Sequence, residues 1–424
     1  MELQEIEVNK IERAILVALK GFGAPDEVVD EYLNELELLA KTAGAETIIR
    51  ITQDKSRFDT AYYVGKGKAE EIKQLVELND IDIIIFDDDL TPTQVRNLEK
   101  MIEKKIIDRS GLILDIFAKH ARTNEAKTQV ELAQLEYMLP RLTRAWTHLS
   151  KQYGGIGTKG PGETQIETDR RIIRTRIAKL KEKLEKIERQ QNTKSLKRQN
   201  LVAASLVGYT NAGKSTLINL LTDADVLAED KLFATLDSTT RSLDLAKNKK
   251  LVISDTVGFI RKLPAHLVAS FNSTLNVVRE ADIILHVVDI SHPFFEDHIK
   301  VVQETLNDLG CESKPTLIIF NKADLINDKH VIDFVKAKYH DSIIISASRG
   351  INIQNLNKKL IEFYDNNFIN QTIKVSTYQS KIISIIYSLA DVIDIKYEEN
   401  FALIKYRTTV ENNNKINKIL YENK

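Results

Sequence analysis

Residues 201–222 restrict the fold more than any other stretch of the chain, because an apolar run, a glycine-bounded loop and an amphipathic run follow one another directly. The apolar run LVAASLV leads into Gly208-x-x-x-x-Gly213-Lys214-Ser215, and TLINLL follows. A loop of this kind between a strand and a helix surrounds phosphate groups with backbone N–H groups. The stretch therefore predicts a strand–loop–helix unit that binds a nucleoside triphosphate.

Three further motifs follow in order, and each one ends a run rich in β-branched residues. DTVG (255–258) ends KLVIS, NKAD (321–324) ends TLIIF, and SAS (346–348) ends SIII. Strands that alternate with amphipathic stretches form mostly parallel sheets, and open sheets of this class bind ligands at the carboxyl ends of their strands. We therefore expect an α/β domain with a doubly wound, mostly parallel sheet, in which the four motifs meet at one edge.

The residue types of these motifs suit the groups of a triphosphate and of Mg²⁺. We expect Lys214 to reach the outer phosphates and the Gly258 N–H to face the γ-phosphate. The hydroxyl of Ser215 and the carboxylate of Asp255 are oxygen ligands of the kind that Mg²⁺ prefers. The complete set of expected nucleotide contacts is Gly208, Tyr209, Thr210, Asn211, Ala212, Gly213, Lys214, Ser215, Thr216, Asp255, Gly258, Asn321, Lys322, Asp324, Ser346, Ala347 and Ser348.

The NKAD motif predicts that the base is guanine. Asp324 can accept hydrogen bonds from N1–H and from the N2 amine of guanine, whereas adenine offers neither donor there. A site built to receive such donors rejects an analogue without them by about 10⁴-fold or more. Lys322 can lie along the base plane, and the Ala347 N–H can donate to the guanine oxygen. We therefore expect GTP with Mg²⁺.

The remainder of the chain divides by its patterns into further segments. A length of 424 residues is enough for roughly three domains. We predict a small N-terminal α/β domain over 1–115, a long antiparallel helical hairpin over 116–199, the nucleotide-binding domain over 200–366 and a small α+β appendage over 367–424. The longest apolar runs are too short to cross a bilayer, and the N-terminus lacks the pattern of an export signal. We therefore expect a cytoplasmic protein.

The helical hairpin is predicted from two long helical patterns. The first covers about 123–152, and Pro140 should kink it. The second carries an apolar seam at heptad spacing, formed by Ile173, Ile177, Leu180, Leu184 and Ile187. Such a seam needs a partner, and the preceding helix is the nearest one. Docking of the seam on a neighbouring domain is the alternative.

A glycine-rich loop joins the two helices, and the second helix is strongly basic. Five of the 16 glycines of the chain are Gly154, Gly155, Gly157, Gly160 and Gly162. Residues 167–199 contain 12 Lys or Arg and five Asp or Glu, a net charge of +7 in a chain whose total is −1. A positive surface beside a close-approaching loop suits RNA. A plain flexible linker is the alternative. The basic and aromatic residues near the loop are Arg141, Arg144, Trp146, Lys151, Tyr153, Arg170, Arg171, Arg174 and Arg176.

These segments resemble the HflX family of GTPases, relatives of the Obg proteins. The stretch 108–171, from DRSGLILDIFAKHARTNEAKTQVELAQLEYMLPRL to GGIGTKGPGETQIETDRR, looks like the family signature, and FDTAYYVGKGKAEEI and LTPTQVRNLE look like its upstream domain. LFATLDSTTR (232–241) looks like its first switch segment. Thr235 matches the threonine that closes over Mg²⁺ and the γ-phosphate, with Thr239 or Thr240 as alternatives. The resemblance thus implies a catalytic set of Lys214, Thr235 and Gly258, and Mg²⁺ ligands Ser215, Thr235 and Asp255.

The resemblance also implies partners. A family member is expected to bind the large (50S) ribosomal subunit and its rRNA, with no DNA and no membrane span, and to split stalled or idle 70S ribosomes. Phe259 follows Gly258 where many GTPases carry the glutamine that orients water, so we expect slow intrinsic hydrolysis that the ribosome stimulates. Two alternatives are an Obg-like checkpoint in large-subunit assembly and an RNA-binding module whose nucleotide is a structural latch. ATP-driven remodelling of RNA by the N-terminal domain is a weaker alternative. The glycine-containing turn of 64–72 could also contact an anion or a nucleotide.

Overall fold

The computed structural model describes most of the chain, and its described residues belong to two compact units. The described ranges are 11–21, 23, 25–55, 57–142, 165–195, 202–222, 232–233, 239–246, 249–263, 267 and 272–422. The first unit comprises Met1–Glu185, Glu229–Asp237 and Arg261–Asn272, and the second comprises Lys186–Ala228, Ser238–Ile260 and Ser273–Lys424. Two short segments of the nucleotide-binding region thus belong to the N-terminal unit.

A four-stranded parallel sheet forms the centre of the first unit, in the order β2-β1-β3-β4. Its strands are β1 (Glu12–Lys20), β2 (Ala45–Asp54), β3 (Ile83–Phe86) and β4 (Lys105–Asp108). The four helices after these strands are α1 (Asp26–Ala43), α2 (Lys66–Leu78), α3 (Pro92–Ile102) and α4 (Arg109–His120). Strand β3 is buried along its whole length, as expected for a parallel strand covered on both faces. The predicted small α/β fold is confirmed.

Local sequence signals account for where these helices begin and end. Helix α3 begins after Thr91, whose side chain accepts from the Gln94 N–H in a capping box, and Pro92 is its first residue. Helix α1 ends at Gly44, which adopts a left-handed conformation with φ of 93°. The predicted boundary between residues 115 and 116 falls inside α4.

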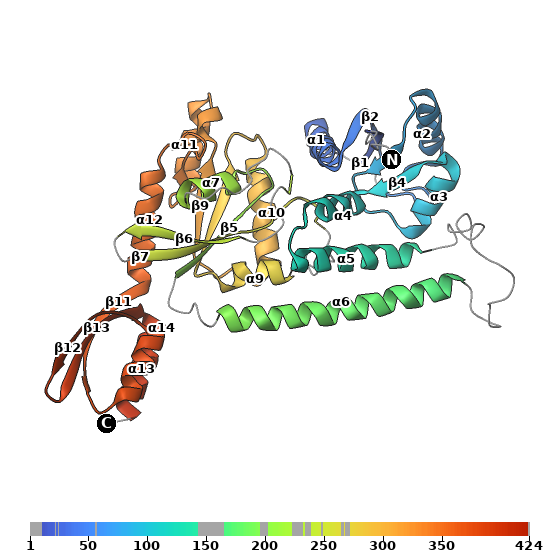
Figure 1. The fold of residues 1–424 in the computed structure, drawn as a ribbon. Coiled ribbons are helices and arrows are strands. Elements are labelled where there is room, and N and C mark those ends of the chain that lie inside the picture. Colours follow the sequence, from blue (N-terminus) through green and yellow to red (C-terminus); the bar gives the residue numbers. More distant parts are fainter. Residues whose placement is uncertain are drawn as a thin grey trace, which may run out of the picture. The chain divides into compact units, whose positions relative to one another are not determined.

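The predicted hairpin is present as two antiparallel helices, α5 (Asn124–Met138) and α6 (Gln165–Ser195) (Figure 1). The α-helical part of the first one ends at Met138, and Pro140 lies in the 3-10 turn η1 (Leu139–Arg141). The helices are joined by ion pairs of Glu131 with Arg176 at 2.7 Å and of Glu136 with Lys181 at 2.9 Å. On the apolar seam of α6, Leu180 is buried and the other four members are half-buried. The glycine-rich loop lies outside the described residues.

Three arginines that the sequence placed beside that loop are engaged within the first unit instead. Arg141 donates to the Asp108 carboxylate at 2.8 Å, and its guanidinium lies over the Tyr137 ring. Arg170 donates to the Leu142 carbonyl, and Arg176 pairs with Glu131. The expected position of these arginines near the loop stays a prediction, because the loop lies outside the described residues. Sequence spacing located them on the right helices but did not reveal their partners.

A six-stranded sheet forms the core of the nucleotide-binding domain, in the order β10-β9-β8-β5-β7-β6 (Figure 1). Its strands are β5 (Val202–Gly208), β6 (Thr240–Ala246), β7 (Lys249–Asp255), β8 (Ile283–Asp289), β9 (Thr316–Asn321) and β10 (Ile343–Ile344). The associated helices are α7 (Lys214–Thr222), α9 (Asn272–Glu280), α10 (Phe295–Asp308), the 3-10 turn η5 (Ala323–Leu325), α11 (Lys329–Lys338) and α12 (Ile353–Asn367). The pairings are parallel except that of β6 with β7. The predicted doubly wound, mostly parallel fold is confirmed.

The C-terminal appendage is a three-stranded antiparallel sheet in the order β11-β13-β12, with two helices. Its elements are β11 (Phe368–Ser376), α13 (Ser380–Leu389), β12 (Asp391–Glu398), β13 (Phe401–Thr409) and α14 (Val410–Glu422). The predicted α+β class is confirmed. The polar stretch DNNFINQ belongs to these elements, because α12 ends at Asn367 and β11 begins at the next residue. The Tyr364 ring stacks on Phe368 at this connection, with ring centroids 4.6 Å apart.

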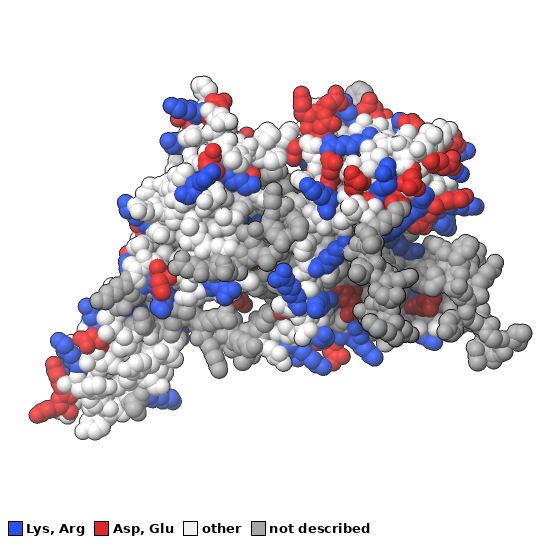
Figure 2. Space-filling view, turned by 45° about the horizontal axis from the view of Figure 1, so that its top comes forward, with Lys and Arg blue, Asp and Glu red and all other residues white. Residues whose placement is uncertain are grey.

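Charges of both signs are interspersed over the first unit, at the right of the space-filling view (Figure 2). Across the described residues, none of the helices has the length and apolarity needed to cross a membrane.

Candidate functional site: a nucleotide pocket at the strand ends

The loop between β5 and α7 is held in shape by two glycines that admit no side chain. A Cβ at Gly208 would lie 2.2 Å from the backbone oxygen of Val287 on the adjacent strand. Gly213 has a left-handed φ of 89°, and a Cβ there would lie 2.3 Å from Nδ2 of Asn321. The backbone thus passes too close to its neighbours for any other residue. The first N–H groups of α7, from Lys214 onward, have no partner within the helix and can donate to phosphate oxygens.

Lys214 is buried beneath this loop. Its Nζ donates to the carbonyl oxygens of Gly208 at 3.0 Å and of Tyr209 at 2.8 Å. Burial lowers the pKa of Lys214 to about 8, against the opposing effect of the Asp255 carboxylate. A phosphate beside Nζ would favour the charged form, so the ammonium is placed to respond to an anion in the loop.

Ser215 and Asp255 bring two oxygen ligands together. The Ser215 hydroxyl donates to Oδ2 of Asp255 at 3.2 Å, and Oδ1 of Asp255 accepts from the Thr256 N–H at 3.0 Å. A hydroxyl and a buried carboxylate at this separation fit a hard divalent cation such as Mg²⁺, which takes oxygen ligands and retains several waters. Thr235 lies outside the described residues. Of its alternatives, Thr240 is in β6 with its hydroxyl 3.0 Å from the Ser254 hydroxyl, and the Thr239 carbonyl accepts from the Asp255 N–H.

The DTVG motif is tied to the phosphate-binding loop by two backbone hydrogen bonds. The Phe259 N–H donates to the Gly208 carbonyl at 3.0 Å, and the Thr210 N–H donates to the Phe259 carbonyl at 2.8 Å. Between them, a Cβ at Gly258 would lie 2.8 Å from Cγ2 of Thr210 and 3.2 Å from Nζ of Lys214. Gly258 is therefore beside Lys214, as the expected phosphate contacts require. The Phe259 ring is packed into the core with 2% of the residue exposed.

Asn321 connects three of the four motifs. Its Nδ2 donates to the Ala212 carbonyl at 3.0 Å, and its Oδ1 accepts from the Ala347 N–H at 2.9 Å. Asn321 is buried, so both bonds are shielded from water. Its side chain thus fixes the phosphate-binding loop relative to the SAS loop.

Asp324, by contrast, is exposed at the rim. Its carboxylate accepts from the Ser346 hydroxyl at 2.5 Å, and this hydrogen bond is the main reason that its pKa is lowered. Lys322 has a left-handed φ of 64° and pairs with Asp289 at 2.7 Å. The Ser346 hydroxyl therefore orients the Asp324 carboxylate.

Two functional connections were not visible from the sequence. Arg261 and Lys262, which follow DTVGFI, bind acidic residues of the first unit: Lys262 Nζ is 2.5 Å from carboxylate oxygens of both Asp87 and Asp88, and Arg261 donates to Glu35 at 3.3 Å. Asp87 also accepts from the buried Arg109 at 2.8 Å. Only the DDD run after β3 hinted at such an acidic cluster, and it does not indicate the partner.

Phe233, within the predicted first switch, packs edge-on against Phe117 of α4, with ring centroids 4.7 Å apart. The segments that carry Phe233 and Lys262 thus both pack within the first unit. In the nucleotide-binding domain itself, the Tyr209 ring stacks on His298 of α10 at 3.8 Å.

An open parallel sheet with these four motifs at its strand ends defines a P-loop GTPase. Three family models match successive parts of the chain: a GTP-binding GTPase N-terminal region over 30–118, a GTP-binding GTPase middle region over 120–198, and a 50S ribosome-binding GTPase over 203–322.

Similar proteins extend this match over most of the chain. The GTPase HflX of Flavobacterium psychrophilum is 54% identical over 320 residues, which cover 76% of this chain and 77% of that protein. The GTPase HflX of Caldanaerobacter subterraneus subsp. tengcongensis is 47% identical over 376 residues, with 88% and 84% covered. A crystal structure of SsGBP in complex with GDP is 26% identical, with a TM-score of 0.47 and with 84% of this chain and 99% of that chain covered. The chain belongs to the GTPase HflX family, and it is a GTPase that binds guanine nucleotide.

Proposed function

We propose that this GTPase binds the large ribosomal subunit and, with GTP bound, splits stalled or idle 70S ribosomes in the cytoplasm. The observation that carries the proposal is the match of residues 203–322 to a family described as a 50S ribosome-binding GTPase. The basic helix α6, in the same chain as the nucleotide site, gives this description a physical basis. Ribosomal RNA is a polyanion, and lysine and arginine bind it by releasing its counterions.

In the proposed mechanism, the chain positions the phosphates and the base with separate groups. Lys214 and the first N–H groups of α7 hold the phosphates, and Asp324 selects guanine. Ser215, Asp255 and Thr235 would hold Mg²⁺, which neutralises the charge that develops on the phosphate oxygens. Lys214, Thr235 and Gly258 form the proposed catalytic set. Phe259 cannot orient the attacking water, so hydrolysis is slow until a partner supplies that function.

The contacts of Phe233 and Lys262 within the first unit support a coupling of nucleotide state to ribosome binding. The chain passes from one compact unit to the other between Ile260 and Arg261, directly after the DTVGFI stretch. Lys262 is anchored to Asp87 and Asp88 in the first unit. A movement of Gly258 toward the γ-phosphate would therefore pull on an anchored segment, and linkage requires that ribosome binding in turn changes nucleotide affinity.

The rRNA-binding surface is proposed to be the hairpin, with the loop of Gly154 to Gly162 at its tip. Arg176 and Lys181 are used in pairs with α5, but Arg174 and Lys179 are exposed and have no acidic partner among the described residues. These two side chains remain available for phosphates. The loop itself, with five glycines, can approach RNA closely.

Sucrose-gradient analysis of 70S ribosomes mixed with the protein tests the proposal. With GTP or a non-hydrolysable analogue, we expect free subunits and co-sedimentation of the protein with the 50S particle. Lys214→Ala, and deletion of residues 154–162, should each abolish splitting, the latter without loss of GDP binding. Arg174→Gln with Lys179→Gln should weaken 50S binding more than the control Lys66→Gln with Lys100→Gln, which removes the same charge from the N-terminal domain.

Intact 70S particles at every protein concentration would contradict the splitting function. Binding only to immature large subunits would instead favour the assembly checkpoint. Ribosome binding without any GTP turnover would favour a structural role of the nucleotide.

A further inference from the structure

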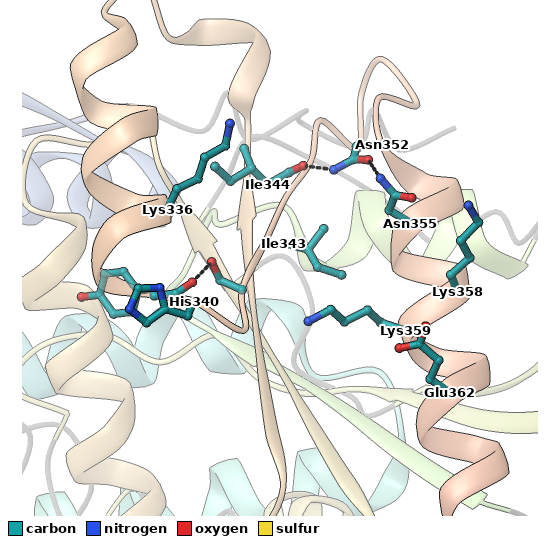
Figure 3. A pocket seen from close by; sticks show the side chains of 11 residues that line it. Lys336, His340, Ile343, Ile344, Asn352, Asn355, Lys358, Lys359 and Glu362 are labelled. Carbon is teal, nitrogen blue, oxygen red and sulfur yellow. Dashed lines mark hydrogen bonds between the residues drawn. The ribbon is translucent and has the colours of Figure 1, made fainter.

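A cavity at the edge of the nucleotide-binding domain lies apart from the nucleotide site. It has a volume of about 540 Å³ and lies between α11 and α12, with the edge strand β10 as its floor (Figure 3). Lys336 and His340 line it from the α11 side, and Asn355, Lys358 and Lys359 line it from α12. None of the nucleotide-binding motifs contributes a residue to this cavity.

The charges around the cavity are unbalanced. Three lysines line it, against one acidic residue, Glu362. Among the residues that the structure describes, neither Lys336 nor Lys358 has an ion-pair partner, and Lys359 Nζ donates only to the Asp341 carbonyl at 3.3 Å. Other lysines of this domain are paired: Lys300 with Asp297, Lys338 with Glu296, Lys322 with Asp289 and Lys249 with Asp365. Concentrated positive charge without local compensation attracts anions.

Two asparagines at the start of α12 that line the cavity are hydrogen-bonded within the protein. Nδ2 of Asn352 donates to the Ile344 carbonyl at 2.7 Å, and Nδ2 of Asn355 donates to Oδ1 of Asn352 at 2.6 Å. Figure 3 shows the Lys359 side chain extending toward β10 between the two helices. An ammonium carries three N–H donors, and Lys359 uses one of them, so it can still donate to an oxyanion.

We infer that this cavity binds backbone phosphates of RNA, so that the nucleotide-binding domain makes a second ribosome contact beside the one proposed for the hairpin. The inference rests on the proposed function, because the partner that brings phosphates to this domain is the large subunit. The cavity has lysines on both walls and is open to one side. Such a groove suits the extended phosphodiester chain of RNA better than it suits a single, fully enclosed anion. The lysine ammonium binds phosphate as a point charge and leaves the RNA sequence unread.

The test compares the salt dependence of 50S binding by the full chain in two matched triple variants. The first, Lys336→Gln with Lys358→Gln and Lys359→Gln, removes the lysines of the cavity. The control, Lys250→Gln with Lys300→Gln and Lys329→Gln, removes the same charge from exposed positions of the same domain that do not line the cavity. Both variants should bind GDP as the unchanged protein does, because none of the six lysines is in the nucleotide site.

We expect the cavity variant to bind 50S subunits about tenfold more weakly near 0.1 M salt. Its slope of log K against log[salt], which is negative, should be smaller in magnitude by about 2. The control should change the slope by less than about 0.5. Equal slopes for the two variants would overturn the inference. In a separate experiment, GDP-saturated protein is titrated with pyrophosphate. If the unchanged protein binds pyrophosphate, the cavity variant does not, and the two variants have equal slopes with 50S subunits, the cavity binds a free anion and the RNA assignment is overturned. If the unchanged protein fails to bind 50S subunits at low salt, the proposed function itself fails, which is a distinct result.

Discussion

The side-chain amide of Asn321 donates to the carbonyl oxygen of Ala212 at 3.0 Å, across a sequence separation of 109 residues. The Asn321 side-chain oxygen Oδ1 accepts a hydrogen bond from the Ala347 N–H. The asparagine of the NKAD motif therefore positions two loops, while the carboxylate of Asp324, three residues later, accepts from the Ser346 hydroxyl.

We predict that Asn321→Ala lowers the thermal stability of the nucleotide-binding domain and weakens GDP binding. Removing the amide leaves the Ala212 carbonyl and the Ala347 N–H buried without partners, which costs about 1–3 kcal/mol for each group. We expect GDP affinity to fall by about tenfold or more, measured by fluorescence titration beside a melting curve. Asn307→Ala, on the exposed face of α10, is the control and should change neither quantity. An unchanged GDP affinity for Asn321→Ala would show that the two loops are held in another way.

Nucleotide binding should take up a proton at alkaline pH. Lys214 has a pKa of about 8 in the protein because it is buried, and a phosphate beside Nζ raises it. At pH 8.5 more than half of the free protein carries neutral Lys214, and at pH 7 very little does, so GDP with Mg²⁺ should take up roughly 0.5–1 proton at pH 8.5 and about 0.1 at pH 7. Calorimetry in buffers of different ionisation enthalpy measures this number. In Lys214→Met at saturating nucleotide, proton uptake should be the same at pH 8.5 and pH 7. Equal uptake at both pH values in the unchanged protein would contradict the assignment of the proton to Lys214.

The nucleotide-binding domain should lose stability in mild acid because of His286. Burial, with a smaller effect from Lys214, lowers the pKa of this β8 residue to about 3. An unfolded histidine binds its proton near pH 6.5, so between about pH 6.5 and 3 the unfolded state holds more protons and the free energy of unfolding falls as pH falls.

The loss attributable to His286 should be about 2 kcal/mol between pH 7 and 5. In urea denaturation of the full chain, the free energy of unfolding of His286→Gln should therefore fall less between pH 7 and 5 than that of the unchanged protein, by about this amount. His330→Gln, at an exposed position, controls for the loss of a histidine. Identical pH profiles for the His286 variant and the unchanged protein would refute the role of this residue.

Placing glutamine at position 259 should not speed hydrolysis. The Phe259 side chain is packed in the core, so Phe259→Gln would bury an amide there and cost about 2–4 kcal/mol of stability. We expect single-turnover GTP hydrolysis to stay at the basal rate or below it and the melting temperature to drop. Phe259→Leu retains apolar packing and should lose less stability. A rise of about tenfold in the rate for Phe259→Gln would mean that the side chain at 259 can reach the attacking water.

The strand ends of the nucleotide site could be predicted from the sequence because each motif directly follows an apolar run. Val202–Gly208 and Thr316–Asn321 are central parallel strands, and buried strands of this kind read as nearly continuous apolar runs. Strand β6 was missed, since it is an edge strand in which Leu243 alone is buried and the apolar signal is weak. The long helix α6 could be predicted because, unlike β6, it carries a strong apolar pattern: its heptad seam extends over many turns.

Contacts between distant segments could not be predicted. Nothing near Arg141 in the sequence indicates that Asp108 accepts its hydrogen bond, and nothing near Lys262 indicates Asp87 and Asp88. The partners in these pairs are far apart in the sequence and meet only in the folded chain, so a local residue pattern does not identify them. The same limit explains why Asn321 was placed among the nucleotide contacts without its bond to Ala212.

GTP turnover measured with and without purified 50S subunits tests the central claim most directly. We predict slow turnover by the protein alone and stimulation of about tenfold or more by the subunits, lost on deletion of residues 154–162 and absent in Lys214→Ala. Equal turnover with and without subunits, together with failure to co-sediment with them at low salt, would contradict a GTPase switch coupled to the ribosome.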